Sequence, residues 1–283
     1  MSVERRPRKV NMFRLGMYLQ HTREFLELSY EQAAERAGCD VEWLIRVEEG
    51  LDEPAPERVR HILERYGVIG ARIAEVMIDL AYRPDGPSWL DQHAADISAN
   101  LRDVLVCEAE ATIVRSYRVR LIPELLRTEE YERRIAADRY PRISPDVAWD
   151  ILDHRQRLTP GGRSRRIDAM LDEAVLKIPV GGPQVMIGQL RHLLDVTDSP
   201  DITLRVAPFD SPAFEERAHD FDVFEFFSAA DRVSVAHISL GAELAPKDLL
   251  AVWEEIDERA ALSPDESRVM IESALADFTA RHG

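Results

Sequence analysis

Residues 28–50 read LSYEQAAERAGCDVEWLIRVEEG, and this stretch decides how the first part of the chain folds. Ser29 and Gln32 stand at the spacing of a capping box, in which each side chain satisfies a backbone N–H group at the start of a helix. Gly38 suits the left-handed conformation that ends such a helix, and Asp40 is a good N-cap for the next one. The stretch therefore predicts two short helices joined by a tight turn.

More helices are expected on both sides of this pair. Leucines recur at helical spacing over residues 13–26 and predict a helix there. Gly50 ends the second helix of the pair, and Pro56 fits the first turn of a further helix that closes at Gly67. With one more helix after it, residues 1–80 are predicted to be an all-α domain of five short helices that contains no strand.

Two helices joined by a glycine turn make a helix-turn-helix, whose second helix enters the major groove of DNA. In its core, capping and turn residues, the quoted stretch resembles that of Cro/repressor-like regulators. The resemblance implies a structural ion pair, Arg23 with Glu48, that braces the first helix against the recognition helix. It also implies that a DNA-binding face includes Tyr30, Gln32, Val41, Glu42, Trp43 and Arg46.

A basic arm precedes the first helix and consists of Arg5, Arg6, Arg8 and Lys9. Arms of this kind enter the minor groove next to the recognition helix in some DNA-binding proteins. We therefore add these four residues to the predicted DNA-binding set. A disordered polar tail is the alternative interpretation of the arm.

The charge of the chain opposes DNA binding. The 283 residues carry a net charge of −16, and residues 1–68 contain 11 Lys and Arg against 13 Asp and Glu, which leaves −2. Between Asp40 and Glu53 six acids stand against the single base Arg46. An acidic groove face loses the phosphate attraction that supplies most non-specific affinity. Glu42 nevertheless suits cytosine, because a carboxylate accepts a hydrogen bond from cytosine N4.

The helical pattern breaks at residues 82–88, and we place a linker at 81–98 ahead of a C-terminal domain at 99–283. Helices are expected at 95–115, 123–135, 145–158 and 183–196, with a final helix that begins at the capping box of Ser263. Strands are expected only after Ser164, at 166–171, 202–206, 221–227 and 233–238. The second part of the chain is therefore predicted to be a mixed α+β domain.

Four stretches in this part resemble one family in order and spacing. They are LIPELLRTEEYERRI (121–135), MLDEAVLKIPVGGPQVMIGQLRHLL (170–194), ITLRVAPF (202–209) and ALSPDESRVMIES (261–273). They are similar to an uncharacterised, antitoxin-like C-terminal domain of actinobacterial regulators, whose members are often encoded beside a small partner protein. The chain departs from the family pattern with Glu124 in place of the usual Gly and Arg127 in place of the usual Gln.

No catalytic or metal-binding motif stands out. The histidines of the C-terminal part lack the spacing of metal ligands and are interpreted as solvated surface residues: His154, His192, His219 and His237. Asp172 and Glu173 are adjacent at a strand end, so their side chains should point apart and into solvent. Gly181 and Gly182 suit a turn before a helix. We expect no enzyme activity, no metal and no cofactor.

The remaining expectations concern location and function. No run approaches the ~20 apolar residues that cross a bilayer, and Cys39 and Cys107 have no partnering motif, so a reduced, cytoplasmic protein is expected. The leading function is a DNA-binding transcriptional regulator whose C-terminal domain forms a homodimer and binds an effector or a small partner protein. The alternative is a degenerate helix-turn-helix protein that has lost DNA binding. Such a protein would act through its C-terminal pocket in partner binding, ligand binding or a recruited catalytic role.

Overall fold

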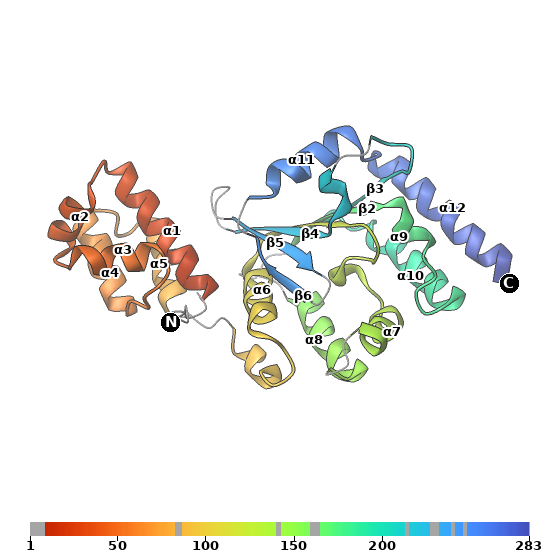
Figure 1. Ribbon diagram of the computed structural model, residues 1–283, viewed down its shortest axis with the longest axis horizontal. Coiled ribbons are helices and arrows are strands. Elements are labelled where there is room, and N and C mark those ends of the chain that lie inside the picture. The colour runs from red at the N-terminus through yellow and green to blue at the C-terminus, as the bar shows by residue number, and fades with distance from the viewer. Residues whose placement is uncertain are drawn as a thin grey trace, which may run out of the picture. The chain divides into compact units, whose positions relative to one another are not determined.

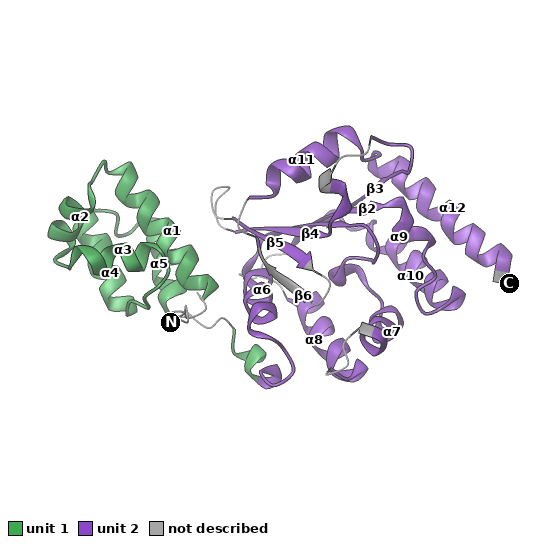
Figure 2. Cartoon of the chain, in the orientation of Figure 1, with its two compact units in different colours: residues 1–91 green, residues 92–283 purple. Residues whose placement is uncertain are grey.

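The structure is a computed structural model, and its chain divides into two compact units, residues 1–91 and 92–283 (Figures 1 and 2). It describes residues 9–82, 87–139, 143–158, 165–212, 215–226, 232–238, 241–245 and 248–282. Three members of the predicted arm, Arg5, Arg6 and Arg8, lie outside the described residues. None of the helices that the structure describes is long and apolar enough to cross a membrane.

The described part of residues 1–80 is all-helical, as predicted. Its α-helices are α1 (Val10–Phe25), α2 (Tyr30–Ala37), α3 (Val41–Glu48), α4 (Pro56–Tyr66) and α5 (Arg72–Tyr82). After them the predicted linker contains the 3-10 helix η1 (Ser88–His93).

The predicted capping signals are present. The Ser29 hydroxyl accepts a hydrogen bond from the Gln32 backbone N–H at 3.3 Å, and the Gln32 side chain accepts one from the Ser29 N–H at 2.9 Å. Gly38 ends α2 with a φ of 62°, in the left-handed region. Asp40 then accepts a hydrogen bond from the Trp43 N–H at 3.1 Å. These local bonds set the tight turn between α2 and α3.

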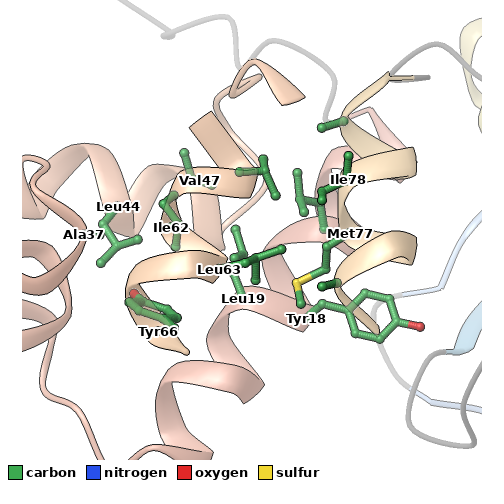
Figure 3. Packing of buried hydrophobic residues seen from close by; sticks show 14 of the residues in the cluster. Tyr18, Leu19, Ala37, Leu44, Val47, Ile62, Leu63, Tyr66, Met77 and Ile78 are labelled. Atoms are coloured by element: carbon green, nitrogen blue, oxygen red, sulfur yellow. The ribbon is translucent and has the colours of Figure 1, made fainter. Parts of the chain in front are cut away.

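One apolar cluster joins the helices of this unit (Figure 3). Each of the five helices contributes a fully buried side chain: Leu19, Ala37, Leu44, Ile62 and Met77. Because α2 and α3 have only eight residues each, they are stabilised by this shared burial rather than by helix propensity.

Helix α1 meets the end of α3 backbone to backbone. A Cβ atom added at Gly16 would lie 2.3 Å from the carbonyl oxygen of Glu48 and 2.7 Å from that of Val47. Such distances are shorter than any real Cβ contact, so this crossing requires glycine. The position of α3 therefore depends on the absence of a side chain in the middle of α1.

The second unit is built on a six-stranded mixed sheet with the strand order β3-β2-β1-β4-β5-β6. Its strands are β1 (Ile113–Arg118), β2 (Arg166–Asp172), β3 (Ile202–Ala207), β4 (Phe221–Glu225), β5 (Arg232–Ile238) and β6 (Gly241–Leu244). Strands β1, β2 and β3 are parallel, whereas β4, β5 and β6 continue the sheet in antiparallel pairs. The predicted mixed α+β class is confirmed.

Helices cover both faces of this sheet (Figure 1). They are α6 (Ala99–Glu110), α7 (Glu129–Arg139), α8 (Pro145–Arg157), α9 (Glu173–Lys177), α10 (Pro183–Val196), α11 (Leu250–Arg259) and α12 (Pro264–His282), with the 3-10 helices η2 (Glu124–Leu126) and η4 (Glu215–Ala218). The buried Trp253 of α11 packs with Tyr117 and Met170 on one face. Buried residues of α10 and α12 pack with Leu171 and Leu204 on the other face.

The prediction that strands occur only after Ser164 is wrong, because β1 begins at Ile113. Helix α6 ends at Glu110, where Ala111 takes an extended conformation. The β-branched Ile113 and Val114 then enter a central strand that pairs with β2 on one side and with β4 on the other. This long-range pairing overrides the apolar spacing that predicted one helix over 95–115.

The prediction of one helix over 123–135 is also wrong. Residues 124–126 form the 3-10 helix η2, and α7 begins only at Glu129. Thr128 separates the two, since its hydroxyl accepts a hydrogen bond from the Tyr131 N–H at 3.4 Å. A hydroxyl that bonds the backbone three residues ahead favours a new helix start.

We predict that Gly16→Ala lowers the free energy of unfolding of the first unit by about 1–3 kcal/mol, the usual cost of overpacking a tight contact. Hydrogen exchange of the α1 and α3 amides, with urea denaturation of the intact chain, measures the loss. Gly188→Ala in α10 is the matched control, because nothing lies within 4 Å of its added Cβ. The control should gain up to about 1 kcal/mol from helix propensity. Equal stability of both variants would contradict the close approach.

Candidate nucleic-acid interface

A buried ion pair fixes the recognition helix α3 against α1. Arg23 Nε donates to the two Glu48 carboxylate oxygens at 2.9 and 3.1 Å, and Arg23 Nη2 donates to Oε2 at 2.9 Å. The two residues are only 7% and 4% exposed. Hydrogen bonding to Glu48 is the main reason why the pKa of Arg23 is raised. The structure thus contains the ion pair that the sequence predicts.

Arg23 also organises the start of α2. Its Nη1 donates to the carbonyl oxygen of Leu28 at 3.2 Å, and its guanidinium lies 3.9 Å from the centre of the Tyr30 ring. A cation over an aromatic face is attracted by the ring electrons. Tyr30 is therefore half-buried against Arg23, although the sequence places it on the DNA-binding face.

Helix α4 holds the turn between α2 and α3. Arg58 Nη2 donates to the carbonyl oxygen of Gly38 at 2.7 Å, and its guanidinium lies 5.4 Å from the centre of the Trp43 ring. Arg36 and Arg65 make a reciprocal clasp, in which the Nε of each donates to the carbonyl oxygen of the other at 2.7 Å. These three arginines therefore have structural partners inside the domain.

The predicted DNA-binding residues divide by exposure. Gln32, Glu42 and Arg46 are exposed. Val41 and Trp43, like Tyr30, are half-buried and pack at the margin of the apolar core. The outer face of α3 therefore presents mainly charged groups to solvent.

The two described cations of the predicted set are engaged by neighbouring acids. Arg46 forms an ion pair with Asp52, and this hydrogen bond is the first cause of its raised pKa. Lys9 Nζ lies 2.8 Å from a carboxylate oxygen of Glu53. The sequence indicated an acidic face but gave no signal of these pairings, which depend on how the chain turns after α3.

A second group of charges lies buried in the C-terminal unit. Arg118, at the end of β1, is 2% exposed and lies 2.9 Å from a carboxylate oxygen of Asp222 on β4. His237 of β5 contacts the same carboxylate through Nε2 at 2.5 Å. The interpretation of His237 as a solvated surface residue is therefore wrong. His237 lies on the strand next to that of Asp222, and its side chain is on the same face of the sheet. The pairing register of β4 and β5 brings the two side chains together, and the sequence alone does not give that register.

The two departures from the family pattern meet each other in this cluster. Glu124 accepts from Arg127 at 3.0 Å and from Arg118 at 2.8 Å. Burial by itself would raise the pKa of Glu124, but the two guanidinium groups outweigh it and hold that pKa well below its usual range. Arg127 also bonds Glu132 at 2.7 Å. The unusual acid and the unusual base thus neutralise each other.

Asp172 and Glu173 are likewise engaged rather than solvated, which corrects the sequence-based interpretation. Asp172 caps α9 by accepting from the Ala174 N–H at 3.1 Å, and its other oxygen accepts from Arg217 at 2.9 Å. Glu173 accepts from the Phe209 N–H at 2.9 Å. The two carboxylates point to different partners, so they do not form an acid/base pair.

A cleft of about 590 Å³ lies between α7 and the turn before α10. Arg134 and Asp138 line it from α7, and Gly181 and Gly182 line it from the turn. Both glycines have positive φ, at 69° and 91°, as expected for a turn that starts a helix. Across the described residues, no group of three His, Cys, Asp or Glu side chains is placed to hold a metal ion.

Comparisons with protein families match both parts of the chain. A model described as a helix-turn-helix domain matches residues 14–76. A model described as a domain of unknown function, DUF5753, matches residues 101–273, which is more than half of the chain. The comparison with curated proteins found no match, and neither did the comparison with solved structures.

We predict that Glu48→Ala destabilises the first unit by about 3–5 kcal/mol, because it leaves the guanidinium of Arg23 buried without its carboxylate. Glu24→Ala is the matched control, since Glu24 lies 3.8 Å from the same guanidinium but its side chain is 51% exposed. The control should change stability by less than about 1 kcal/mol. Urea denaturation of the intact chain, with hydrogen exchange of the α1 and α3 amides, compares them. Equal losses would refute the bracing role of Glu48.

Proposed function

The chain belongs to the family defined by the domain of unknown function DUF5753, and we propose that it is a cytoplasmic, DNA-binding transcriptional regulator. In this proposal the helix-turn-helix domain reads DNA, and the C-terminal domain forms a homodimer and binds an effector or a small partner protein. The resemblance to Cro/repressor-like and antitoxin-like actinobacterial regulators supports the same assignment. The proposal gives the chain no catalytic step.

The observation that carries the proposal is the placement of α3. The Arg23–Glu48 pair and the close approach at Gly16 hold one side of this helix against α1. Its opposite side, with Glu42 and Arg46, is exposed. A recognition helix needs this combination of a fixed axis and an open outer face, because it must enter the major groove as a rigid body.

Roles follow from the chemistry of these side chains. Arg46 suits a guanine edge or a phosphate, and the carboxylate of Glu42 suits the N4 amino group of cytosine. The arm of Arg5, Arg6, Arg8 and Lys9 supplies further positive charge for the backbone or the minor groove. Base contacts by Glu42 would give sequence information, while the cations would supply attraction to any DNA.

The charged cluster supports the effector-binding part of the proposal. Strands β1, β2 and β5 run in the same direction. Their carboxyl ends therefore lie at the same end of the sheet, where they place Arg118, Asp172 and His237. The strand order reverses beside β1, because β2 and β3 follow on one side of it and β4 lies on the other. Ligands of open α/β sheets bind at the carboxyl ends of strands, near such changes in topology.

The ion pairs Arg46–Asp52 and Lys9–Glu53 favour a second candidate function. Both described cations of the predicted DNA-binding set are paired with a carboxylate, so neither is held ready for a DNA phosphate. In this alternative the helix-turn-helix domain has lost DNA binding, and the protein acts through its C-terminal domain as a partner-binding, ligand-binding or recruited catalytic protein. DNA binding by the intact chain separates the two functions.

We predict that the intact chain binds the upstream region of its own gene in a gel-shift titration at 50–200 mM salt. Removal of residues 1–8 should weaken binding to all sequences alike and flatten the salt dependence by about one unit per lost phosphate contact. Arg46→Ala should cost about 1–3 kcal/mol, and it should relax specificity only if Arg46 contacts a base.

The variant with both Glu42→Gln and Glu49→Arg decides between the two functions. It replaces two exposed acids of the α3 region by residues common in helix-turn-helix regulators, so it should strengthen non-specific binding. If the natural chain binds no DNA at low salt and this variant does, the regulator proposal fails and the alternative is supported. Tight binding by the natural chain excludes the alternative.

The homodimer is a separate prediction. One helix-turn-helix contacts few base pairs, and two copies related by two-fold symmetry present their recognition helices to half-sites about 34 Å apart. Light scattering at micromolar concentration should therefore give twice the mass of the chain. A clean monomer mass, with DNA binding intact, would exclude the homodimer but leave the DNA-binding proposal standing.

A further inference from the structure

The turn after α3 has a fixed path. Gly50 takes a φ of 69°, and the Leu51 N–H donates back to the carbonyl oxygen of Arg46 at 2.8 Å. A Cβ added at Gly50 would lie 2.7 Å from the Cα of Phe13, so the turn rests directly on the backbone of α1. This helix end sends the chain back along α3 and brings Asp52 and Glu53, named here the acidic turn, to the recognition side.

Each acid of the acidic turn holds one cation of the predicted DNA-binding set. Asp52 pairs with Arg46 of α3, and Glu53 pairs with Lys9. Lys9 is the N-cap of α1 and the last residue of the basic arm. The Asp52 side chain is only 20% exposed while that of Arg46 is 59% exposed, so a half-buried carboxylate meets a solvent-facing guanidinium. Two consecutive acids thus neutralise the charge of Arg46 on α3 and the charge of Lys9 at the end of the basic arm.

We propose that the acidic turn is a built-in competitor for DNA phosphates, in which the carboxylates of Asp52 and Glu53 occupy the cations that would otherwise hold the DNA backbone. The inference rests on the proposed DNA binding and adds a device that limits its strength. Because phosphate contacts carry no sequence information, the competition should weaken binding to every DNA sequence alike.

The competition also predicts an unusual salt dependence. A cation that pairs with a phosphate normally releases counterions from DNA. For each phosphate neutralised, the logarithm of the binding constant then falls by about 0.9 for every tenfold rise in salt concentration. Here the carboxylate displaced by that phosphate must take up a counterion from solution, which offsets the release. The salt slope of the natural chain should therefore be smaller than its number of phosphate contacts implies.

The test uses the intact chain and two labelled duplexes of equal length, one from the upstream region of its own gene and one unrelated. Fluorescence anisotropy between 50 and 300 mM salt compares the natural chain with Asp52→Asn, Glu53→Gln and the double variant. We expect the double variant to bind both duplexes about tenfold more tightly at 100 mM salt. Its salt slope should be steeper by about one to two units.

Two controls separate competition from a general change of charge. Glu35→Gln with Glu64→Gln removes the same charge from exposed positions on α2 and α4, and it should produce a clearly smaller gain and leave the slope unchanged. In the second control, Arg46→Gln is added to Asp52→Asn, and Lys9→Gln is added to Glu53→Gln. Each gain should disappear, because the released cation is what binds the phosphate.

The outcomes are distinct. If the natural chain binds DNA but the acidic-turn variants bind no more tightly than the control pair, the competitor role is overturned and the proposed function stands. A gain that survives Arg46→Gln and Lys9→Gln also overturns it. If only the acidic-turn variants bind DNA, the competitor is supported while the natural chain is not a DNA-binding regulator. If no variant binds at 50 mM salt, both proposals fail.

Discussion

The buried contact between α1 and α3 is the constraint on which the helix-turn-helix unit depends. Gly16 lets the two backbones touch in the middle of α1, and the ion pair of Arg23 with Glu48 closes the same interface near the C-terminal end of α1. Because a charge buried without its partner costs several kcal/mol, this geometry admits little adjustment. The direction of α3 follows from this contact, and Gly50, packed on the backbone of Phe13, then fixes the turn after α3.

The positive charge of this unit is used mostly for structure. Arg23, Arg36, Arg58 and Arg65 bond carboxylates or carbonyl oxygens inside the domain. Arg46 pairs with the nearby acidic turn. A domain with a net charge near zero can therefore be well organised and still attract DNA weakly. Its surface reflects a balance between holding short helices in place and binding a polyanion.

The C-terminal unit also uses arginines to hold its structure together. Arg118 of β1 bonds Asp222 of the antiparallel half of the sheet, and Asp222 also contacts His237. Glu124, from the segment just after β1, accepts from both Arg118 and Arg127. Each pairing joins a cation to an anion, and the bond of Arg118 to Asp222 joins residues that are distant in sequence. The cluster therefore ties the parallel half of the sheet to the antiparallel half.

The sequence by itself determined the features that depend on neighbouring residues. The capping box at Ser29, the left-handed Gly38 and the five-helix pattern follow from bonds that span a few positions, and the Arg23–Glu48 pair followed from family resemblance. Only the tertiary structure decided the rest. Strand β1 exists because β2 and β4 pair with it, and His237 is half-buried because register places it against Asp222. Likewise, the cations of the recognition side are neutralised because Gly50 turns two acids back toward them. Such outcomes depend on contacts between distant segments, which local sequence patterns do not encode.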